Sequence, residues 1–426
     1  MLDPKFIREN IEKLKINYQR RKDENLLKFL DDFLRLDEDL RGLKVEIDDL
    51  RKERNECSQE VNKLRKAGNR VDEILKKVKE IPEQIKSKEL EYGEKEKELR
   101  EIHSKLPNPL HEDVPYGKGE EDNKEIKKWG KIIKFDFKPK NHIEILEKLG
   151  IVDFEASAKI SGNGFYVLKG DLALLNQALI TYAIDFMKKR GYIYIEPPLM
   201  IKKEILFAAL DQGAFDQTIY QVEGEELCLI GTSEHPILGL HARDIIMEED
   251  LPKKYFSYTM CFRKEIGSHG INEKGLWRTH QFNKVEQFIF CKPNESWKMF
   301  DELLKNTEEF FQSLEIPYRL VDACTGDLAV WKARMIDLEA WRPTTEDYGE
   351  LTSLSNCLAF QAQSLGIKLR NKNGEKELVH TLNNTAVATS RALVAIIENY
   401  QQEDGSIKVP KVLVPYFGKK IIKQSI

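Results

Sequence analysis

Arginines, glutamates and a phenylalanine lie close together in the segment 262–286, FRKEIGSHGINEKGLWRTHQFNKVE. Arginine forks match phosphate oxygens in pairs and stay charged, so Arg263 and Arg278 can hold a triphosphate and offset the charge that develops as pyrophosphate leaves. Phe282 offers a flat apolar face to a purine ring, and Glu265 can accept a hydrogen bond from the exocyclic amine of adenine. These residue types indicate an adenylate-forming site. The alternative is an exposed hairpin whose charges only pair with one another.

Two strands are expected to position these side chains. Apolar and polar residues alternate around Phe262 and again over 281–290, as in half-buried strands. The stretch 266–275 between them is rich in Gly, Ser and Asn, which predicts a mobile loop. Because residues two apart on a strand share a face, we expect Arg263 and Glu265 to point to the same side. We expect Arg278 and Phe282, on the second strand, to lie on that side as well.

This segment resembles the second signature motif of class II aminoacyl-tRNA synthetases, and its RTHQFNKVE portion resembles the seryl-tRNA synthetases in particular. Further segments resemble the same family, in its order and spacing, along nearly the whole chain. They are LPNPLHEDVPYGKGEEDN (106–123), GNGFYVLKG (162–170), IGTSEHP (230–236), ELTSLSNCLAFQA (350–362) and HTLNNTAVATSRALVAIIENYQ (380–401).

The resemblance implies an α+β protein with two domains. Residues 1–105 would form an antiparallel α-helical coiled-coil arm that binds tRNA, and residues 106–426 a class II catalytic domain with an antiparallel β-sheet flanked by helices. The amphipathic stretch 171–189 and the strand-like YIYIEPPLM resemble the family's first motif, whose proline, here Pro198, lies at the interface of a homodimer. An ordinary helix–turn–strand unit is the alternative for that stretch.

Heptad periodicity supports the arm independently of the resemblance. Apolar residues recur at alternating spacings of four and three in two stretches separated by Ala67–Arg70, where a Gly-Asn pair predicts a tight turn. Two helices joined there would pack back on each other, and a helix of ~40 residues is about 60 Å long. The seams are Phe29, Phe33, Leu36, Leu40, Leu43, Ile47 and Leu50, then Ile74, Val78, Ile81, Ile85, Tyr92 and Leu99.

Basic residues toward the distal half of this arm are candidates for contacts with RNA phosphates. The resemblance implies that the arm recognises the long variable arm of a serine tRNA by its shape, as proteins commonly recognise double-stranded RNA. A dimerisation coiled coil or a solvated spacer is the alternative. The candidates are Arg51, Arg54, Lys63, Arg65, Lys66, Lys76, Lys77 and Lys79.

A pocket for a small hydroxyl amino acid needs a carboxylate for the ammonium group, a cation for the carboxylate, and buried polar groups that alanine would leave unsatisfied. Glu234 and Glu286 are the anionic candidates. The resemblance implies that Thr232, Glu286 and Thr385 contact L-serine and that Arg263 joins its carboxylate to the α-phosphate of ATP. The expected serine site is Thr232, Ser233, Glu234, Arg263, Glu286, Asn383 and Thr385.

The remaining motifs concern the nucleotide. Thr389-Ser390-Arg391 followed by ALVAIIENY resembles the third motif, in which a strand enters a helix and the arginine stacks on the nucleotide. The resemblance also implies that Glu350 and Ser353 hold Mg²⁺ between phosphates, and hard oxygen ligands at alternate spacing suit that ion. Arg263 and Arg391 are the expected catalytic residues. The expected ATP site is Arg263, Lys264, Glu265, Arg278, Phe282, Glu350, Leu351, Thr352, Ser353 and Arg391.

We therefore expect a ligase in which the serine carboxylate attacks the α-phosphate of ATP in line, after which the 3′-terminal adenosine of tRNA(Ser) attacks the seryl-adenylate. Positioning and charge stabilisation suffice for this chemistry, so no side chain has to act as a covalent nucleophile. The resemblance also allows tRNA(Sec) as a second substrate. Two other interpretations stay open: a non-catalytic paralogue, and a ligase that loads a carrier protein and is expected to lack the long arm.

The composition of the chain bears on its partners, its location and the state of its cysteines. The formal net charge of -4 gives no global sign of RNA binding, but a local basic face can still bind RNA because screening limits the reach of distant charges to about 8–10 Å. No apolar stretch approaches the ~20 residues that cross a bilayer, and the N-terminus lacks a signal-peptide core, so we expect a cytoplasmic protein without membrane contact. Six cysteines without a CxxC pair indicate reduced thiols rather than a zinc site.

The sequence departs from the common family pattern at three places. Ser233 stands where alanine is usual, and Leu354 where cysteine or serine is frequent. Gln363-Ser364 stands where an arginine pair is common, which would remove local salt bridges or an RNA contact.

Overall fold

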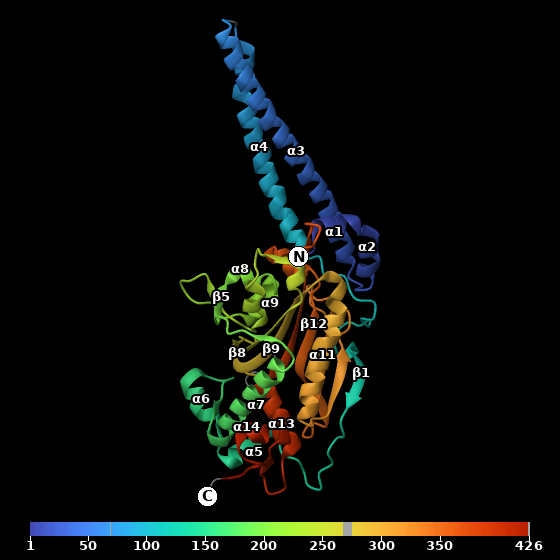
Figure 1. Cartoon of the computed structure of the whole chain (residues 1–426), viewed down its shortest axis with the longest axis vertical. Helices are drawn as coiled ribbons and strands as arrows, with labels where there is room; N and C mark the ends of the chain where they lie inside the picture. The colour runs from blue at the N-terminus through green and yellow to red at the C-terminus, as the bar shows by residue number, and fades with distance from the viewer. Residues whose placement is uncertain (69, 267–274, 425–426) are drawn as a thin grey trace. The chain divides into compact units, whose positions relative to one another are not determined.

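The computed structural model describes residues 1–68, 70–266 and 275–424 and divides into two compact units, Met1–Pro109 and Leu110–Ile426. Figure 1 shows the helices of the first unit in blue and the sheet and helices of the second from green to red. The turn expected at Asn69 and most of the loop expected over 266–275 lie outside the described residues.

Two long helices dominate the first unit, α3 (Glu24–Lys66) and α4 (Asp72–His103). Three ion pairs among the described residues join them at 2.6 to 2.8 Å. The pair nearest the start of α3 involves residue 95 of α4, whereas the two pairs farther along α3 involve residues 88 and 89, nearer the start of α4, so the helices run antiparallel. The predicted antiparallel helical arm is therefore confirmed. The pairs are Asp39–Lys95, Glu46–Lys88 and Glu89–Arg51.

Two short helices that the sequence analysis did not predict, α1 (Pro4–Glu9) and α2 (Ile11–Gln19), complete this unit. They bury Ile7, Leu14 and Tyr18, and Arg8 donates a hydrogen bond of 2.9 Å to Asp37 on α3. Along the long helices the central seam residues are buried and the outer ones half-buried. The buried ones are Phe33, Leu36, Leu40, Leu43, Ile47, Ile81 and Ile85.

A sheet of eight strands, counted over the described residues, forms the second unit in the order β1-β10-β11-β12-β15-β9-β8-β4. All neighbours pair antiparallel except β4 and β8, which confirms the predicted fold class. The strands are β1 (Lys124–Trp129), β4 (Ile193–Tyr194), β8 (Lys253–Phe262), β9 (Gln281–Cys291), β10 (Tyr318–Asp322), β11 (Arg334–Arg342), β12 (Asp347–Asn356) and β15 (His380–Ala388).

Helix α11 (Ser296–Ser313) covers one face of this sheet, along which it lies in Figure 1. Thr307 on α11 accepts hydrogen bonds from Asn384 on β15 at 2.8 Å and from Gln287 on β9 at 2.9 Å. Neighbouring residues on a strand point to opposite faces, so Thr385 and Glu286 point away from α11. The face opposite α11 is therefore the one available for a site.

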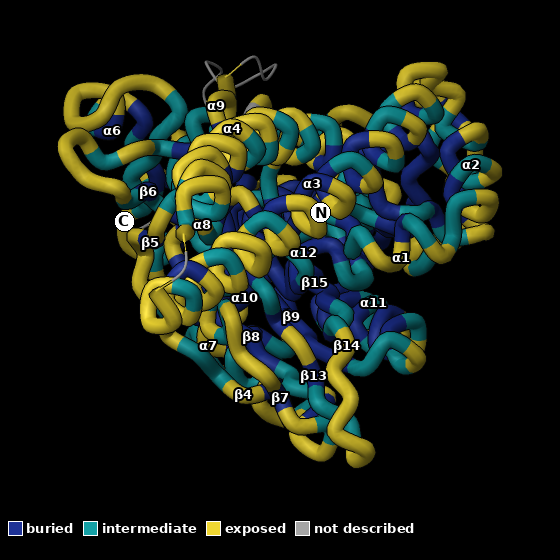
Figure 2. Tube along the Cα trace, turned by 90° about the horizontal axis from the view of Figure 1, so that it is seen from above, coloured by how far each residue is buried: buried dark blue, intermediate teal, exposed yellow. Residues whose placement is uncertain are grey.

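Helices α7 (Gly170–Lys188) and α13 (Thr389–Tyr400) also pack on the sheet and share its main core. Figure 2 shows β9 and β15 as buried and most of α4 as exposed. The predicted strand after α7 is largely wrong: only β4 and β5 (Met200–Lys202) form, because Pro197 and Pro198 between them have no N–H to donate to a ladder.

Smaller elements connect this framework. The helices are α5 (His142–Leu149), α6 (Phe154–Ser161), α8 (Lys203–Leu206), α9 (Gln212–Thr218), α10 (Glu234–Gly239), α12 (Phe360–Leu365) and α14 (Val414–Phe417). The strands are β2 (Val152–Asp153), β3 (Val167–Leu168), β6 (Leu227–Leu229), β7 (Ile245–Met247), β13 (Lys368–Arg370), β14 (Lys376–Leu378), β16 (Ile407–Lys408) and β17 (Ile421–Ile422). None of the helices in the described part of the chain is both long and apolar enough to cross a membrane.

Candidate active site

A pocket of about 510 Å³ opens on the sheet face opposite α11. It gathers side chains from β9, β11, β12 and β15, from the start of α13, and from the segments that flank β8 and β9. Of the residues expected from sequence, those in the pocket wall are Thr232, Glu234, Arg263, Glu265, Arg278, Phe282, Glu286, Glu350, Leu351, Ser353, Asn383, Thr385 and Arg391.

Three expected residues are not part of this wall. Ser233 is fully buried, and Thr352 pairs with Leu338 on the face of β12 opposite the one that carries Ser353. The backbone N–H of Lys264 donates to the carbonyl of Thr218 at 2.9 Å.

The two strands expected around the nucleotide site are present, but of the four residues assigned to their shared face only Phe282 lies on a strand, namely β9. β8 ends one residue before Arg263, and β9 begins three residues after Arg278. Glu265 adopts a left-handed backbone with φ of 53°, so the expected alternation of Arg263 and Glu265 on a strand is wrong. Side-chain contacts bring the group together instead. Arg278 Nη1 donates to Glu265 Oε2 at 3.2 Å, and the Arg263 guanidinium lies 5.3 Å from the Phe282 ring centre.

Arg263 is held at both its backbone and its side chain. Its backbone N–H donates to the carbonyl of His280 at 2.9 Å, and its Nε donates to the carbonyl of Gly231 at 3.1 Å. A guanidinium fixed by its Nε presents its two terminal nitrogens in one direction. That geometry suits an anion placed in the pocket.

One end of the pocket contains two carboxylates, the buried Glu286 and the half-buried Glu234. Lys284 Nζ lies 2.6 Å from Glu286 Oε2 and 2.6 Å from Thr232 Oγ1, and Thr385 Oγ1 donates to Glu286 at 3.2 Å. Sequence analysis missed Lys284, although the alternation in QFNKVE places Phe282, Lys284 and Glu286 on one strand face.

Glu234 is the second carboxylate of this end. It accepts hydrogen bonds from Gln361 Nε2 at 2.7 Å and from Asn383 Nδ2 at 3.1 Å. Burial, followed by repulsion from Glu286, raises the pKa of the Glu234 carboxyl. Two carboxylates share one lysine here, so the ammonium group of a ligand would relieve their repulsion. Gln361, on α12, was also missed.

A bulge creates the oxygen cluster expected to bind a metal. Residues three apart on a regular strand face opposite sides, so the expectation of alternate spacing for Glu350 and Ser353 is wrong. In β12, however, the pairing with β11 skips Leu351, and this extra residue turns Glu350 and Ser353 to the same face.

Asp337 lies beside this cluster and pairs with Ser353 across the strands. Burial, and then the charge of Glu350, raise the pKa of Asp337 well above its ordinary range. Burial also acts on Glu350, but the charge and hydrogen bond of Arg391 hold the pKa of Glu350 below its ordinary value. Two carboxyl groups and a hydroxyl are the hard oxygen donors that Mg²⁺ prefers, so the donor set fits that ion. Within the described ranges, no group of three His, Cys, Asp or Glu could hold a metal by itself.

Arg391 and Trp277 form the third part of the pocket wall. Arg391 lies in the first turn of α13. Its Nη1 donates a hydrogen bond to Glu350 Oε2 at 3.0 Å, and its Nε donates one to the carbonyl of Trp277 at 3.3 Å. The Trp277 ring fills the space over Gly349, where an added Cβ would lie 2.4 Å from the indole. Trp277 was not predicted, since no periodicity marks an isolated aromatic residue outside the strands.

Comparison with known proteins agrees with both units. The profile described as "Seryl-tRNA synthetase N-terminal domain" matches residues 1–110, and that described as "tRNA synthetase class II core domain (G, H, P, S and T)" matches residues 217–400. The chain is 44% identical to the serine–tRNA ligase of Methanocella arvoryzae over 418 residues, covering 98% of each protein. It is 44% identical to the serine–tRNA ligase of Pyrococcus abyssi over 443 residues, covering 99% of this chain and 97% of the other.

Solved structures give the same result in three dimensions. The seryl-tRNA synthetase of Pyrococcus horikoshii complexed with ATP superposes with a TM-score of 0.93 at 42% identity, over 100% of both chains. The cytoplasmic serine–tRNA ligase of Naegleria fowleri in complex with AMP superposes with a TM-score of 0.89 at 35% identity, over 100% of this chain and 99% of the other.

Proposed function

The chain belongs to the seryl-tRNA synthetases, a family of class II aminoacyl-tRNA synthetases, and we propose that its pocket activates L-serine with ATP before the seryl group passes to tRNA(Ser). One observation carries the choice of amino acid. A set of two carboxylates, a lysine and two threonine hydroxyls, all buried except the half-buried Glu234, shares a pocket with Arg263 and Arg391. A small substrate with an ammonium group and a hydroxyl satisfies that set.

The residues divide the work between the two substrates. Glu286 and Glu234 receive the serine ammonium, and Thr232 and Thr385 supply hydrogen bonds that a substrate without a hydroxyl leaves unmade. Arg263 lies between this end and the nucleotide and offsets charge on the serine carboxylate and the α-phosphate.

The reaction proceeds in two balanced steps. A carboxylate oxygen of serine attacks the α-phosphorus in line, the bond to the bridging oxygen breaks, and pyrophosphate leaves with that electron pair. A hydroxyl of the 3′-terminal adenosine of tRNA then attacks the seryl carbonyl and loses its proton to solvent, while the bond between the carbonyl carbon and the phosphate oxygen breaks and AMP leaves with that electron pair. Orientation and fixed positive charge supply the catalysis.

Mg²⁺ would be held by Glu350 and Ser353, with Asp337 beside them. When bound, the ion would neutralise charge on the phosphates. Arg391, already paired with Glu350, holds that carboxylate in its ionised form for this purpose.

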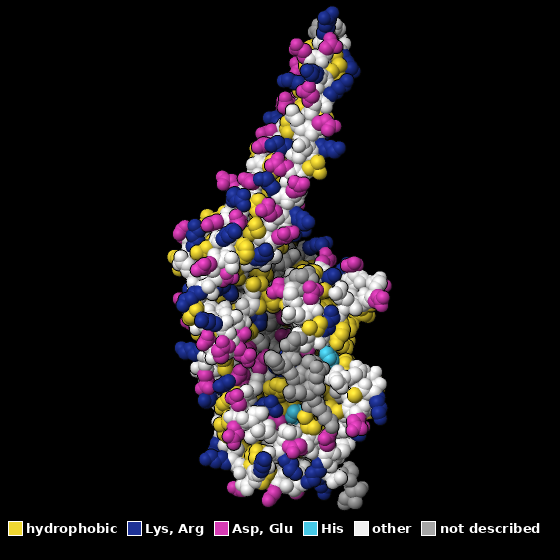
Figure 3. Space-filling model, turned by 180° about the vertical axis from the view of Figure 1, so that it is seen from behind, with side chains coloured by type: hydrophobic (Ala, Val, Ile, Leu, Met, Phe, Trp, Pro, Cys, Tyr) yellow, Lys and Arg dark blue, Asp and Glu magenta, His cyan; other side chains and the backbone are white. Residues whose placement is uncertain are grey.

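Residues 1–105 are proposed to bind the tRNA. Figure 3 shows Lys and Arg side chains interspersed with acidic ones along the helical pair, so phosphate contacts would be local rather than a continuous basic face. Arg51 is the weakest candidate because it already pairs with Glu89 at 2.8 Å and Asp48 at 3.3 Å. The cytoplasm, which holds the pool of tRNA in translation, is the proposed location.

A homodimer is proposed on the side of the catalytic unit that carries Pro198. Large apolar side chains are exposed on α7, on β4, and from residue 199 into β5, and a second copy of the chain would cover them. They are Leu174 (57%), Ile193 (58%), Leu199 (37%) and Met200 (50%).

Transfer of radiolabelled serine to purified tRNA tests this function, with an acyl carrier protein as the alternative acceptor. Label in the tRNA fraction that is released by mild base is the expected result. Transfer to the carrier protein alone would contradict the proposal, as would adenylate formation without transfer to any serine tRNA.

A further inference from the structure

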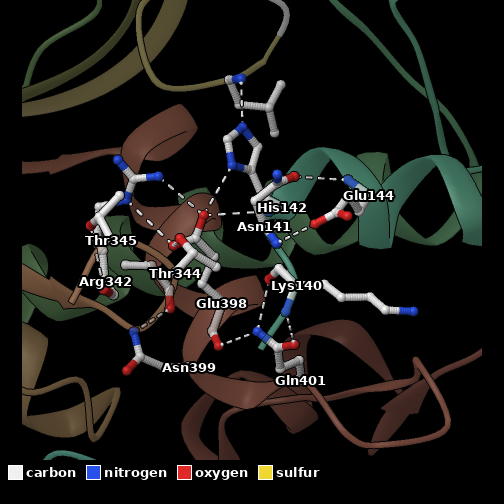
Figure 4. Close-up of polar contacts among 12 residues, drawn as sticks. Lys140, Asn141, His142, Glu144, Arg342, Thr344, Thr345, Glu398, Asn399 and Gln401 are labelled. Carbon is white, nitrogen blue, oxygen red and sulfur yellow. Dashed lines mark hydrogen bonds and ion pairs between the residues drawn. The ribbon is translucent and has the colours of Figure 1, made fainter. Parts of the chain in front are cut away.

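A buried carboxylate outside the pocket is linked to the pocket wall. Glu398 lies on α13 two turns beyond Arg391, and its side chain is 0% exposed. It accepts hydrogen bonds from His142 Nδ1 at 3.1 Å, Arg342 Nη2 at 3.2 Å and Thr344 Oγ1 at 3.0 Å (Figure 4). Burial alone would raise the pKa of Glu398, but the hydrogen bond from His142 and the charge of Arg342 hold it below its ordinary value. Glu398 is therefore a charged and fully paired anchor.

His142 connects this anchor to the segment that precedes β9. Its second ring nitrogen, Nε2, accepts the backbone N–H of Leu276 at 3.2 Å. A ring nitrogen that accepts a hydrogen bond carries no proton, so Nδ1 carries the ring proton and donates a hydrogen bond to Glu398. The contacts on its two nitrogens thus fix both the tautomer and the orientation of the ring, and the backbone N–H of His142 adds a 3.3 Å hydrogen bond to Glu398.

The histidine is itself rigidly placed. It is the first residue of α5, whose N-terminus is closed by a capping box between Asn141 and Glu144. Its side chain is 6% exposed. Gly275 packs against it so closely that an added Cβ would lie 2.9 Å from Nε2.

Leu276 leads directly into two residues of the pocket wall, Trp277 and Arg278. The Trp277 ring lies 4.4 Å from the guanidinium of Arg342, the same arginine that pairs with Glu398. The Trp277 carbonyl accepts from Arg391 at 3.3 Å. The start of this segment is therefore held at Leu276 by His142 and at Trp277 by two arginines, and the position of Arg278 follows from both.

We propose that His142, oriented by Glu398, is a positioning residue for the nucleotide: its hydrogen bond to Leu276 holds the 276–278 segment so that Arg278 meets the phosphates of ATP. This inference rests on the proposed function. It predicts an effect mainly on ATP, because the side-chain hydrogen bonds of His142 go to Glu398 and Leu276, whereas the serine end of the pocket is built from β9, β15 and α10.

Two isosteric substitutions separate the two hydrogen bonds of the ring. The amide nitrogen of His142→Asn can replace Nδ1 as the donor to Glu398, but its side chain is too short to reach Leu276. The longer His142→Gln can place its amide oxygen near Nε2 and accept the Leu276 N–H. His380→Gln is the matched control, since His380 is a histidine of the same unit, hydrogen-bonded to Ser296 at 3.0 Å and outside the pocket wall.

Serine-dependent ATP–pyrophosphate exchange and hydrogen exchange of the 275–280 peptide are measured on each full-length variant. We expect His142→Asn to raise the KM for ATP about tenfold, since small misplacements of a binding group are costly, with the KM for serine changed less than about twofold. The peptide should exchange faster in His142→Asn, whereas His142→Gln and His380→Gln should stay near the parent in both measurements.

Equal losses in the Asn and Gln variants, in proportion to their folded fraction, would show a purely structural role and overturn the inference. So would normal ATP kinetics and normal peptide protection in His142→Asn. Failure of the proposed function would look different, because the unaltered protein would then show no serine-dependent exchange, while equilibrium binding of ATP and peptide exchange would still test His142.

Discussion

Lys284 Nζ lies 2.6 Å from Glu286 Oε2, and the two side chains are only 7% and 2% exposed. The pair is two residues apart on β9, so both side chains emerge on the pocket face of one strand. Thr232 accepts from the same ammonium group at 2.6 Å. At the amino-acid end of the pocket, the positive charge of Lys284 therefore compensates the negative charge of Glu286.

Replacing Lys284 with methionine should destabilise the catalytic unit. Removal of one partner of a buried ion pair leaves the other charge uncompensated, which typically costs about 3–5 kcal/mol. Glu286 would lose its 2.6 Å ion pair, and its repulsion with Glu234 would remain. Urea unfolding measures the loss, with Lys254→Met as the control, because Lys254 pairs with Glu302 where both side chains are more than a quarter exposed. A loss no larger than that of the control would contradict the role given to Lys284.

Arg263→Ala should lower the rate of adenylate formation by a factor of about 10²–10³, the usual effect of removing a preorganised donor from a site of developing charge. Arg263→Lys should recover little, because an ammonium cannot reproduce the fork. Single-turnover formation of seryl-adenylate measures both. Arg190→Ala is the control, since Arg190 pairs with Glu309 away from the pocket wall. Near-normal rates in Arg263→Ala would remove this residue from the mechanism.

Neutralising two cations near the turn of the helical arm should weaken tRNA binding and leave adenylation unchanged, because the pocket lies wholly within the second unit. For Lys63→Gln with Lys77→Gln we expect the KM for tRNA to rise about tenfold and its dependence on salt to become shallower. The double variant Lys28→Gln with Lys44→Gln, farther from the turn, is the control. Equal effects of the two double variants would argue against a local RNA contact.

Acid should destabilise the catalytic unit through His235. Burial, followed by the charges of Lys284 and Arg263, lowers the pKa of His235 to about 3 from its ordinary 6.5. Between these values the unfolded chain binds a proton that the folded chain does not, so the unfolding free energy falls as the pH decreases below about 6.5 and the contribution is absent above it.

Urea unfolding at pH 7, 6 and 5 checks this, followed by tryptophan fluorescence, because all five tryptophans belong to the second unit. One proton bound only by the unfolded chain makes the unfolding free energy change with pH by a slope that approaches about 1.4 kcal/mol per pH unit. His235→Phe should reduce the slope by about that amount. An identical slope in the variant would show that His235 does not titrate on unfolding in this range.

Elements with long periodic patterns were predictable, and short or interrupted ones were not. The heptads of α3 and α4 and the alternation in β8 and β9 extend over many residues, so their signals are strong. Helices α1 and α2 are too short for a repeat to accumulate. The strand expected after α7 fails at Pro197 and Pro198, which remove two ladder donors from an otherwise strand-like run.

The site depends on details that a sequence pattern does not mark. The bulge at Leu351, which brings Glu350 and Ser353 to one face, has no signature in composition or alternation. Contacts across large sequence separations, such as Glu234 with Gln361, arise only when the sheet has formed. Resemblance to family motifs identified 13 of the residues that line the pocket, whereas the roles of Lys284, Trp277 and Gln361 became visible only in the three-dimensional contacts.

Amino-acid-dependent ATP–pyrophosphate exchange with purified protein and Mg²⁺ tests whether the pocket activates serine, with threonine, alanine and glycine as comparisons. We expect exchange with serine, and rates lower by orders of magnitude with alanine and glycine, which leave the buried partners of the hydroxyl unpaired. Threonine is the stricter comparison, since it keeps the hydroxyl and adds one methyl group, and we expect a pocket fitted to serine to discriminate against it less strongly than against alanine. Folded protein that binds ATP yet shows no exchange with serine, or that exchanges equally well with alanine, would contradict this expectation.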